Sequence, residues 1–169
     1  IISTSAGLWS YNIGDTIKFT SIDPYRIIVS GRIKHFLSAF GEHVISEEVE
    51  KAMEAATKLH NVAIREFTVA PKINPIDMLP HHEWYVEFEN FPEDMSAFTK
   101  SLDNEMINQN IYYKDLIDGK ILKSLEVISV ERGGFNNYMK SVGRLGGQNK
   151  VPRLSNDRKI ANKLKTINA

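Results

Sequence analysis

Apolar and polar positions alternate along the N-terminal part of the chain in the manner of short strands. Leu8–Tyr11 and Thr16–Thr20 both show this alternation, and the turn-forming pair Gly14-Asp15 lies between them. We therefore predict a hairpin between these two segments. Tyr25–Val29 follows the turn residues Asp23-Pro24 and is rich in β-branched residues, which predicts a third strand.

A helical pattern begins at Ser46. Ser46 suits an N-cap, and Glu47 and Glu48 lie in the first turn, where the helix dipole favours acidic side chains. The apolar residues that follow recur at helical spacing and define a predicted buried face, formed by Val49, Ala52, Met53, Ala56 and Leu59.

Two alternating segments follow this helix. Asn61–Val69 and Glu83–Glu89 are predicted to be half-buried strands that pair antiparallel. The connection between them contains Pro71, Pro75 and Pro80, so we expect His81 and His82 to lie on a solvated loop. A second amphipathic helix starts near Pro92, with apolar positions at Met95, Phe98, Leu102, Met106 and Ile107.

The remaining pattern predicts shorter elements. These are a helix over Tyr112–Ile117, a strand over Leu125–Val130, a helix over Phe135–Val142, an exposed loop over Gly143–Arg153 and a basic helix over Ser155–Ile167. The order of elements favours an α+β fold: a small, mostly antiparallel sheet of about three strands covered on one face by helices, and preceded by a short β-hairpin unit.

Composition narrows the possible classes. The chain has 169 residues, 42% of them hydrophobic and 25% charged, which suits one globular domain with its own core and appended segments. The absence of cysteine excludes disulfides, cysteine-based zinc sites and a cysteine nucleophile. No apolar run approaches the roughly 20 residues that span a bilayer, and no signal-peptide pattern is present, so we expect a cytoplasmic protein with no membrane partner. Because the first residue is not methionine, we interpret the chain as part of a longer protein.

Charge is distributed unevenly although the net charge is zero. From Arg132 onward there are nine Lys or Arg and one acid, Asp157, a balance of +8, so residues 1–131 carry −8. This basic segment is either a solvated terminal helix or a surface for phosphate, in a nucleotide or in nucleic acid.

Four residues are candidates for chemistry. Asp15 at a turn can accept hydrogen bonds from two neighbouring hydroxyls, as ribose offers, or it is an ordinary turn residue. Arg32 at a strand end can bind ribose or phosphate, or pair with a surface acid. Lys150 can neutralise charge on a phosphoryl group, or it is a solvated loop lysine. The glycine-containing stretch from Ser30 to Val44, which includes Lys34, is a hinge, a binding loop or a turn.

A metal site is not expected in this stretch. His35 and His43 are separated by eight positions and have no carboxylate at ligand spacing, whereas zinc needs three or four converging ligands.

Four motifs occur in a fixed order: Tyr11–Ile17, Pro24–Ile27, Ser30–Glu42 and Lys150–Arg153. Together they resemble the Gretchen-Hagen-type acyl-acid–amido synthetases, a branch of the adenylate-forming superfamily that includes auxin-responsive plant enzymes and bacterial relatives. The resemblance covers nearly the whole chain. It implies that residues 1–31 end a large adenylating domain, that residues 32–35 form a hinge and that residues 36–169 form a mobile C-terminal domain.

The resemblance also implies roles. Asp15 would hold the ribose hydroxyls of ATP, Arg32 would lie beside the ribose, Lys34 would occupy the hinge, and Lys150 would reach the α-phosphate and the acyl carboxylate. The enzyme would adenylate a carboxylic acid and pass the acyl group to an amine or amino acid. ATP and Mg²⁺ would be bound mainly by the N-terminal domain, the partner of this chain, so the chain alone should be inactive.

Two alternatives remain. Another adenylate-former such as a coenzyme A ligase is less favoured, because such enzymes usually have aspartate where Lys34 stands and lysine where Ser38 stands. A nucleic-acid-binding module would use the basic segment, but it would not need Asp15, Arg32 and Lys150 in this order, and the closely spaced surface aromatics of single-strand binders are missing. We therefore expect no nucleic-acid partner. The sequence does not name the acid or the amine.

Overall fold

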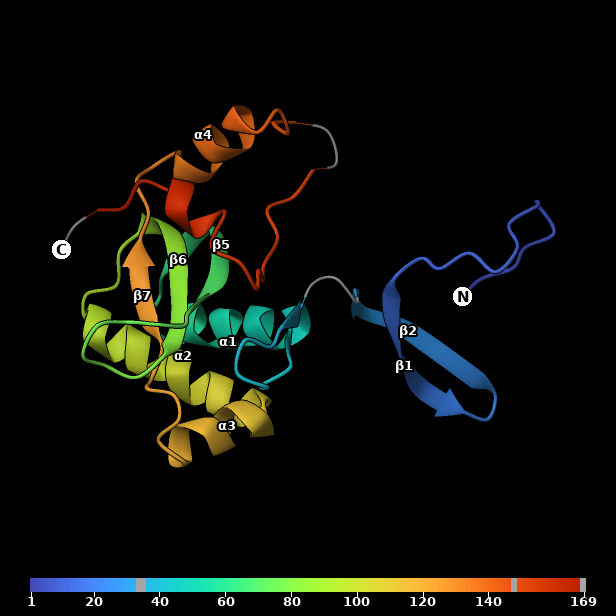
Figure 1. Cartoon of the computed structure of the whole chain (residues 1–169), viewed down its shortest axis with the longest axis horizontal. Helices are drawn as coiled ribbons and strands as arrows, with labels where there is room; N and C mark the ends of the chain where they lie inside the picture. Colours follow the sequence, from blue (N-terminus) through green and yellow to red (C-terminus); the bar gives the residue numbers. More distant parts are fainter. Residues whose placement is uncertain (33–35, 147–148, 168–169) are drawn as a thin grey trace.

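A three-stranded sheet lies at the centre of the C-terminal body of the chain (Figure 1). The computed structural model describes residues 1–32, 36–146 and 149–167. β5 (Ala63–Lys72) pairs antiparallel with β6 (His81–Asn90), as predicted, whereas β6 pairs parallel with β7 (Glu126–Ser129). The α+β class is confirmed, with a mixed sheet in place of a mostly antiparallel one. The parallel pairing follows from the connection, because helices carry the chain from the end of β6 back to the start of β7.

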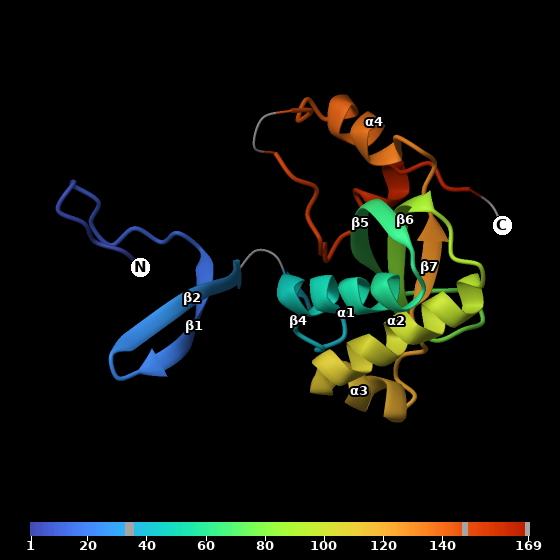
Figure 2. The same cartoon turned by 180° about the vertical axis from the view of Figure 1, so that it is seen from behind.

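Helices α1 (Ser46–Leu59) and α2 (Met95–Gln109) cover one face of this sheet, and α3 (Ile111–Asp118) extends the layer at one end (Figures 1 and 2). The apolar face predicted for α1 is buried except for Leu59, which is 72% exposed at the last turn. Ser46 is the first helical residue and not the N-cap. The N-cap is Ile45, and its backbone N–H donates to the Glu48 carboxylate at 3.0 Å.

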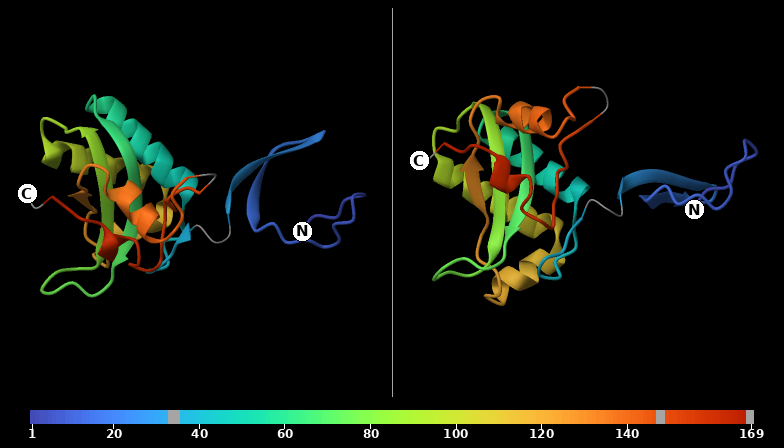
Figure 3. Two further views of the ribbon diagram at one scale, coloured as in Figure 1. Left: turned by 90° about the horizontal axis from the view of Figure 1, so that it is seen from above. Right: turned by 45° about the horizontal axis from the view of Figure 1, so that its top comes forward.

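The opposite face is covered by α4 (Gly134–Ser141) and by residues 149–167, which we call the C-terminal segment. Figure 3 shows both across the sheet from α1. The cover is therefore two-sided, not one-sided as the sequence indicated. The predicted helix over residues 155–167 is wrong, since only the single 3₁₀ turn η1 (Ala161–Lys163) forms there. Ile160 and Leu164 are still buried, in a segment whose short turn of internal hydrogen bonds ends at Leu164 and whose next residues bond to the backbone at the end of β7.

Strands β1 (Asp15–Ile22) and β2 (Tyr25–Arg32) form a hairpin that lies to one side of the body (Figures 1 and 2). The predicted pairing of residues 8–11 with 16–20 is wrong. The turn is at Asp23-Pro24, whose peptide bond is cis, and Tyr11 makes only an isolated bridge to Ile2. The short strands β3 (Phe36–Leu37) and β4 (Val44–Ile45) pair antiparallel at the start of the body.

No helix formed by the described residues combines the length and the apolar character that a membrane crossing requires.

Candidate functional site

Two of the four predicted site residues are brought together by the hairpin. Asp15 begins β1 and Arg32 ends β2, and the two are directly opposite each other in the ladder. Lys34 lies outside the described residues. Lys150 belongs to the C-terminal body, which is formed by residues that follow 33–35 in the chain. The candidate site is therefore divided between the hairpin and the body.

Lys150 is exposed and lines a cavity of about 410 Å³ between the sheet and α4. The cavity lining includes Arg65, Glu66, Glu87, Phe135, Arg144 and Lys150. The acids in this lining already have partners within the chain. Glu66 binds Arg153, and Glu87 accepts the N–H groups of Gly133 at 2.7 Å and Phe135 at 3.3 Å, at the start of α4. Among the described residues, three exposed cations line the cavity: Arg144, Lys150 and Arg65, the last of which pairs with Glu89.

The loop before Lys150 starts from a fixed point. Helix α4 ends in a Schellman motif, in which Gly143 adopts φ +68° and donates to the Lys140 carbonyl at 3.1 Å. The Arg144 N–H donates to the Met139 carbonyl at 2.9 Å. The left-handed conformation at Gly143 costs a glycine little, which suits it to this position.

The segment after Lys150 is fixed to the outer edge of β5. Val151 is buried, and the Pro152 carbonyl accepts the Thr68 hydroxyl at 2.7 Å. The Val69 N–H donates to the Arg153 carbonyl at 2.8 Å, and the Ser155 N–H donates to the Val69 carbonyl at 3.1 Å. Lys150 thus stands one residue before a segment that continues the sheet. Of the expected exposed loop over residues 143–153, residues 143–146, Asn149 and Lys150 are exposed and outside helices and strands, whereas the last residues are bound to the body.

Two arginines of the basic segment neutralise acids of the sheet. Arg153 binds Glu66 of β5, and Arg158 binds Glu83 of β6, which is 5% exposed. Burial by itself raises the pKa of Glu83, but the Tyr85 hydroxyl at 2.7 Å and the charge of Arg158 outweigh it and hold that pKa below 4.5. Burial and the neighbouring Glu83 raise the pKa of Tyr85 to about 12. Part of the C-terminal positive charge is therefore structural.

His81 and His82 are buried, each 1% exposed, so the prediction of a solvated loop is wrong. The reason is that β6 begins at His81 and points the two side chains to opposite faces of the sheet. On the side of the sheet that carries α1 and α2, His82 Nε2 lies 3.0 Å from Glu42 Oε1. Burial by itself raises the pKa of Glu42, and the bond and charge of His82 outweigh it, so that pKa is lowered.

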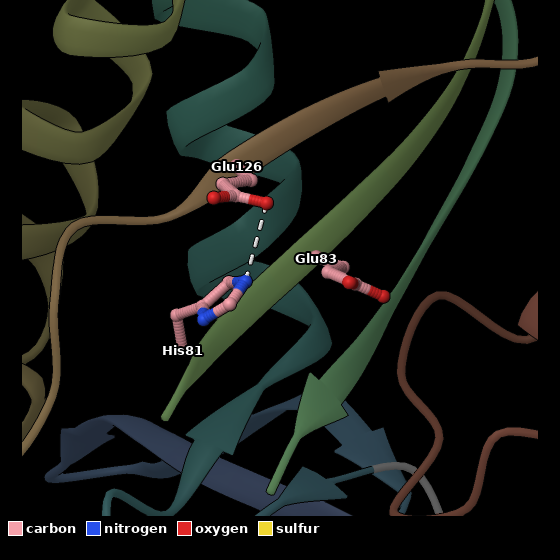
Figure 4. Close-up of side chains that lie close together, drawn as sticks. All are labelled: His81, Glu83 and Glu126. Carbon is pink, nitrogen blue, oxygen red and sulfur yellow. Dashed lines mark ion pairs between the residues drawn. The ribbon is translucent and has the colours of Figure 1, made fainter. Parts of the chain in front are cut away.

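His81, Glu83 and Glu126 form the group of possible metal ligands that the described residues contain (Figure 4). His81 Nε2 lies 3.2 Å from a Glu126 oxygen. Both carboxylates already bind cations of the chain. Glu83 binds Arg158 and lies 3.7 Å from Lys72 Nζ, and Glu126 binds Lys123. A divalent ion would have to displace these partners, so the group does not fit a Mg²⁺ site.

Sequence inspection did not find the Glu42–His82 pair or the Arg158–Glu83–Tyr85 cluster. The acidic alternation of β6 was visible, but nothing in it identifies which distant cation meets which acid. The motif Lys150–Arg153 drew attention to this segment, but the sequence did not show that the segment pairs with β5 or that Arg153 binds the sheet.

Comparison with known proteins agrees with this architecture. Residues 47–159, more than half of the chain, match the GH3 family C-terminal domain. The chain is similar to the solved structure of "GH3.15 acyl acid amido synthetase", with a TM-score of 0.75 and 21% identity over 98% of this chain and 33% of that chain. It is also similar to "AtGH3.15 acyl acid amido synthetase in complex with 2,4-DB", with a TM-score of 0.74 and 20% identity over 98% of this chain and 32% of that one.

The chain thus spans about a third of the length of these solved structures. A comparison with curated proteins gave no match. The range that matches the family begins at the second residue of α1 and ends after Arg158, and so contains the complete sheet, the four helices apart from Ser46, and Lys150. The chain belongs to the GH3 family, and residues 47–159 are its C-terminal domain.

Proposed function

We propose that this chain is the C-terminal part of an ATP-dependent acyl-acid amido synthetase. The enzyme adenylates a carboxylic acid, releases pyrophosphate, and transfers the acyl group to an amine or amino acid. The observation that supports this most is the position of the Lys150–Arg153 motif inside the family range. In it an exposed lysine is followed directly by residues bound to the sheet.

The proposed partner is an N-terminal adenylating domain. We assign residues 1–31 to the end of that domain, residues 32–35 to a hinge and residues 36–169 to the mobile domain. The hairpin supports this division, because large apolar side chains on it are at least half exposed: Ile17, Phe19, Ile22, Tyr25, Ile27 and Val29. A contiguous apolar surface of this kind needs a covering partner.

Each predicted residue has a role that its chemistry suits. The Asp15 carboxylate accepts the two ribose hydroxyls, and Arg32, opposite it in the ladder, lies beside the ribose. Lys150 lies against the α-phosphate and the attacking carboxylate, where it offsets the repulsion between two anions. Lys34 is assigned to the hinge.

Mg²⁺ would supply further positive charge at the phosphates when bound. We assign its ligands to the N-terminal domain, because the cavity acids Glu66 and Glu87 and the His81–Glu83–Glu126 group are bound within this chain. Because the proposed reaction consumes ATP, we place the enzyme in the cytoplasm.

Neither alternative gains support from the geometry. A nucleic-acid module would use the whole basic segment, yet Arg153 and Arg158 of that segment bind sheet acids and leave only its other cations for such a surface. A coenzyme A ligase is a poorer match than an amide synthetase to the residues at positions 34 and 38.

The test is ATP–pyrophosphate exchange by the full-length protein that contains this chain, screened against panels of carboxylic acids. We expect Lys150→Ala to lower the exchange kcat on the order of 10²- to 10³-fold, the usual effect of removing one group that stabilises developing charge. Lys140→Ala is the matched control, since Lys140 is also an exposed lysine, at the end of α4. Its exchange rate should equal that of the wild type.

Undiminished exchange in Lys150→Ala would show that the lysine assignment is wrong. The 169-residue chain alone should give no exchange, and measurable exchange would contradict the proposed division of the site. Amide formation with panels of amines and amino acids then identifies the acyl acceptor.

A further inference from the structure

Residues 151–156, which we call the strap, connect Lys150 to three separate parts of the body. The backbone of Arg153 and Ser155 pairs with Val69 on the edge of β5, in a parallel bridge between Val69 and Leu154. Two side chains of the strap make further hydrogen bonds to the body, in addition to the backbone pairing. They belong to Arg153 and Asn156.

Arg153 binds three residues of two elements, α1 and β5, through one guanidinium. Its Nε donates to Glu50 of α1 at 3.2 Å, and its NH1 donates to Glu66 and, at 3.1 Å, to the Phe67 carbonyl. The guanidinium also lies 4.5 Å from the centre of the Phe67 ring. A planar fork of this kind fixes a backbone position more firmly than a lysine ammonium does.

Asn156 ties the other end of the strap to β3. Its side-chain oxygen accepts the Ser38 N–H at 2.9 Å, and its side-chain nitrogen donates to the Phe36 carbonyl at 2.7 Å. The amide therefore binds the backbone on both sides of Leu37, as a neighbouring strand would. β3 is the first element of the body after the hairpin, at a separation of 120 residues from Asn156.

We propose that Arg153 and Asn156 are positioning residues, which hold Lys150 at a fixed place relative to β3, the strand that follows the predicted hinge. This inference rests on the proposed function, in which the domain turns about that hinge. A lysine on a loop without these contacts would not keep a fixed position relative to the domain when the domain rotates. A lysine one residue from a strap bound to β3, α1 and β5 moves with the body as one piece.

The expected loss of kcat follows from how closely a reacting group must be placed. A misplacement of about 1 Å at a reacting group can lower a rate on the order of 10²-fold. A supporting residue that is lost should therefore lower kcat while leaving ATP binding, assigned to the other domain, unchanged.

The experiment compares Arg153→Ala with Arg158→Ala in the full-length protein. Arg158 is the matched control: it lies in the same C-terminal segment and binds a buried acid, a hydroxyl and the Pro71 carbonyl, but none of its contacts reaches β3 or α1. We expect both variants to lose stability. Arg153→Ala alone should lower the kcat of ATP–pyrophosphate exchange on the order of 10²-fold, with an unchanged KM for ATP.

Conservative variants sharpen the result. Arg153→Lys keeps the charge without the fork and should recover part of the lost kcat. Asn156→Asp keeps the acceptor for Ser38 but cannot donate to Phe36, so its kcat should lie between those of the wild type and Asn156→Ala. Full kcat in Asn156→Ala would overturn the assignment of Asn156.

A second readout does not depend on catalysis. In the 169-residue chain, amide hydrogen exchange at Ser155 should accelerate on the order of tenfold in Arg153→Ala, as expected for loss of a charge-assisted hydrogen bond. If amide exchange at Ser155 is no faster in Arg153→Ala than in the wild type, the proposal that Arg153 holds the strap in place is wrong, whatever the activity.

The two proposals fail differently. Equal loss of kcat in Arg153→Ala and Arg158→Ala, with Lys150→Ala inactive, would overturn the positioning role and leave the proposed function standing. Full activity in Lys150→Ala would remove the proposed function of the lysine, and the strap would then be judged by exchange at Ser155 alone.

Discussion

The two faces of β6 are both buried, but they are held by different physical means. Trp84, Val86 and Phe88 face α1 and α2, where apolar area and ring stacking dominate, and His82 on the same side binds the buried Glu42 carboxylate. On the other face, Glu83 and Glu87 are buried against the C-terminal segment and α4. Each acid there has a specific partner from more than 40 positions further along the chain.

The difference shows that burial alone does not reveal how a surface is stabilised. At Trp84, Val86 and Phe88 the helical face tolerates apolar side chains that fill the same volume, because transfer from water is nondirectional. The acidic face depends on a few cations and N–H groups, since an unpaired buried charge is costly. Substitutions on the two faces should therefore have different sizes and different pH dependence.

The largest effect is expected on the helical face. Trp84→Ala removes a fully buried ring that stacks on Phe67, with ring centres 5.7 Å apart. The free energy of unfolding should fall by about 3–5 kcal/mol, as for other large aromatic truncations. Urea unfolding of the chain, followed by circular dichroism, measures it. The loss should be nearly independent of pH, and a strongly pH-dependent loss would contradict the comparison.

An intermediate effect is expected from Arg158→Ala on the acidic face. Among the described residues it leaves Glu83 with Tyr85 and Lys72, and it should cost about 1–3 kcal/mol at neutral pH. Because the pKa of Glu83 is lowered in the folded state, the pairing contributes fully above pH 4.5 and is lost as pH falls through the folded-state pKa. The difference between wild type and variant should therefore narrow in acid.

Unfolding curves at several pH values test this expectation. A double-mutant cycle with Glu83→Gln isolates the part that belongs to the ion pair. A deficit that does not narrow at the most acid pH at which the wild type stays folded would mean that packing of the Arg158 side chain, and not its charge, is what matters.

The smallest effect is expected at the edge of the acidic face. Arg65 and Glu89 form an ion pair at 2.8 Å, but their side chains are 41% and 55% exposed. Arg65→Ala should change the free energy of unfolding by about 0–1 kcal/mol, and the change should shrink in high salt. Thermal melts at low and high salt measure it. A loss as large as that of Arg158→Ala would show that exposure does not separate the two pairs.

Sequence patterns predicted the elements whose signals are local. The α1 face from Val49 to Ala56, the β5–β6 pair and helix α3 follow from periodicity and turn residues. The same holds for the position of Lys150 in an exposed loop. In each case the residues that decide the structure lie close together in the chain.

Elements decided by distant contacts were missed. Ile160 and Leu164 have helical spacing, yet the segment around them binds the sheet, and the basic run offers few acids for helical side-chain pairs. His81 follows a proline and looked like a loop residue, but pairing with Lys72 makes it the first residue of β6. Asn156 carried no signal, because its partners in β3 lie at the other end of the body.

The C-terminal segment also protects the sheet from association with other chains. Leu154 bridges to Val69 on the open side of β5, and Thr166 bridges to Val130 at the end of β7. One stretch of chain thus occupies hydrogen-bonding positions at both borders of the sheet. Exposed strand borders are templates for aggregation. A chain that ends before Arg153 leaves both borders open to pairing with a second copy, so the last residues matter for solubility as well as for the position of Lys150.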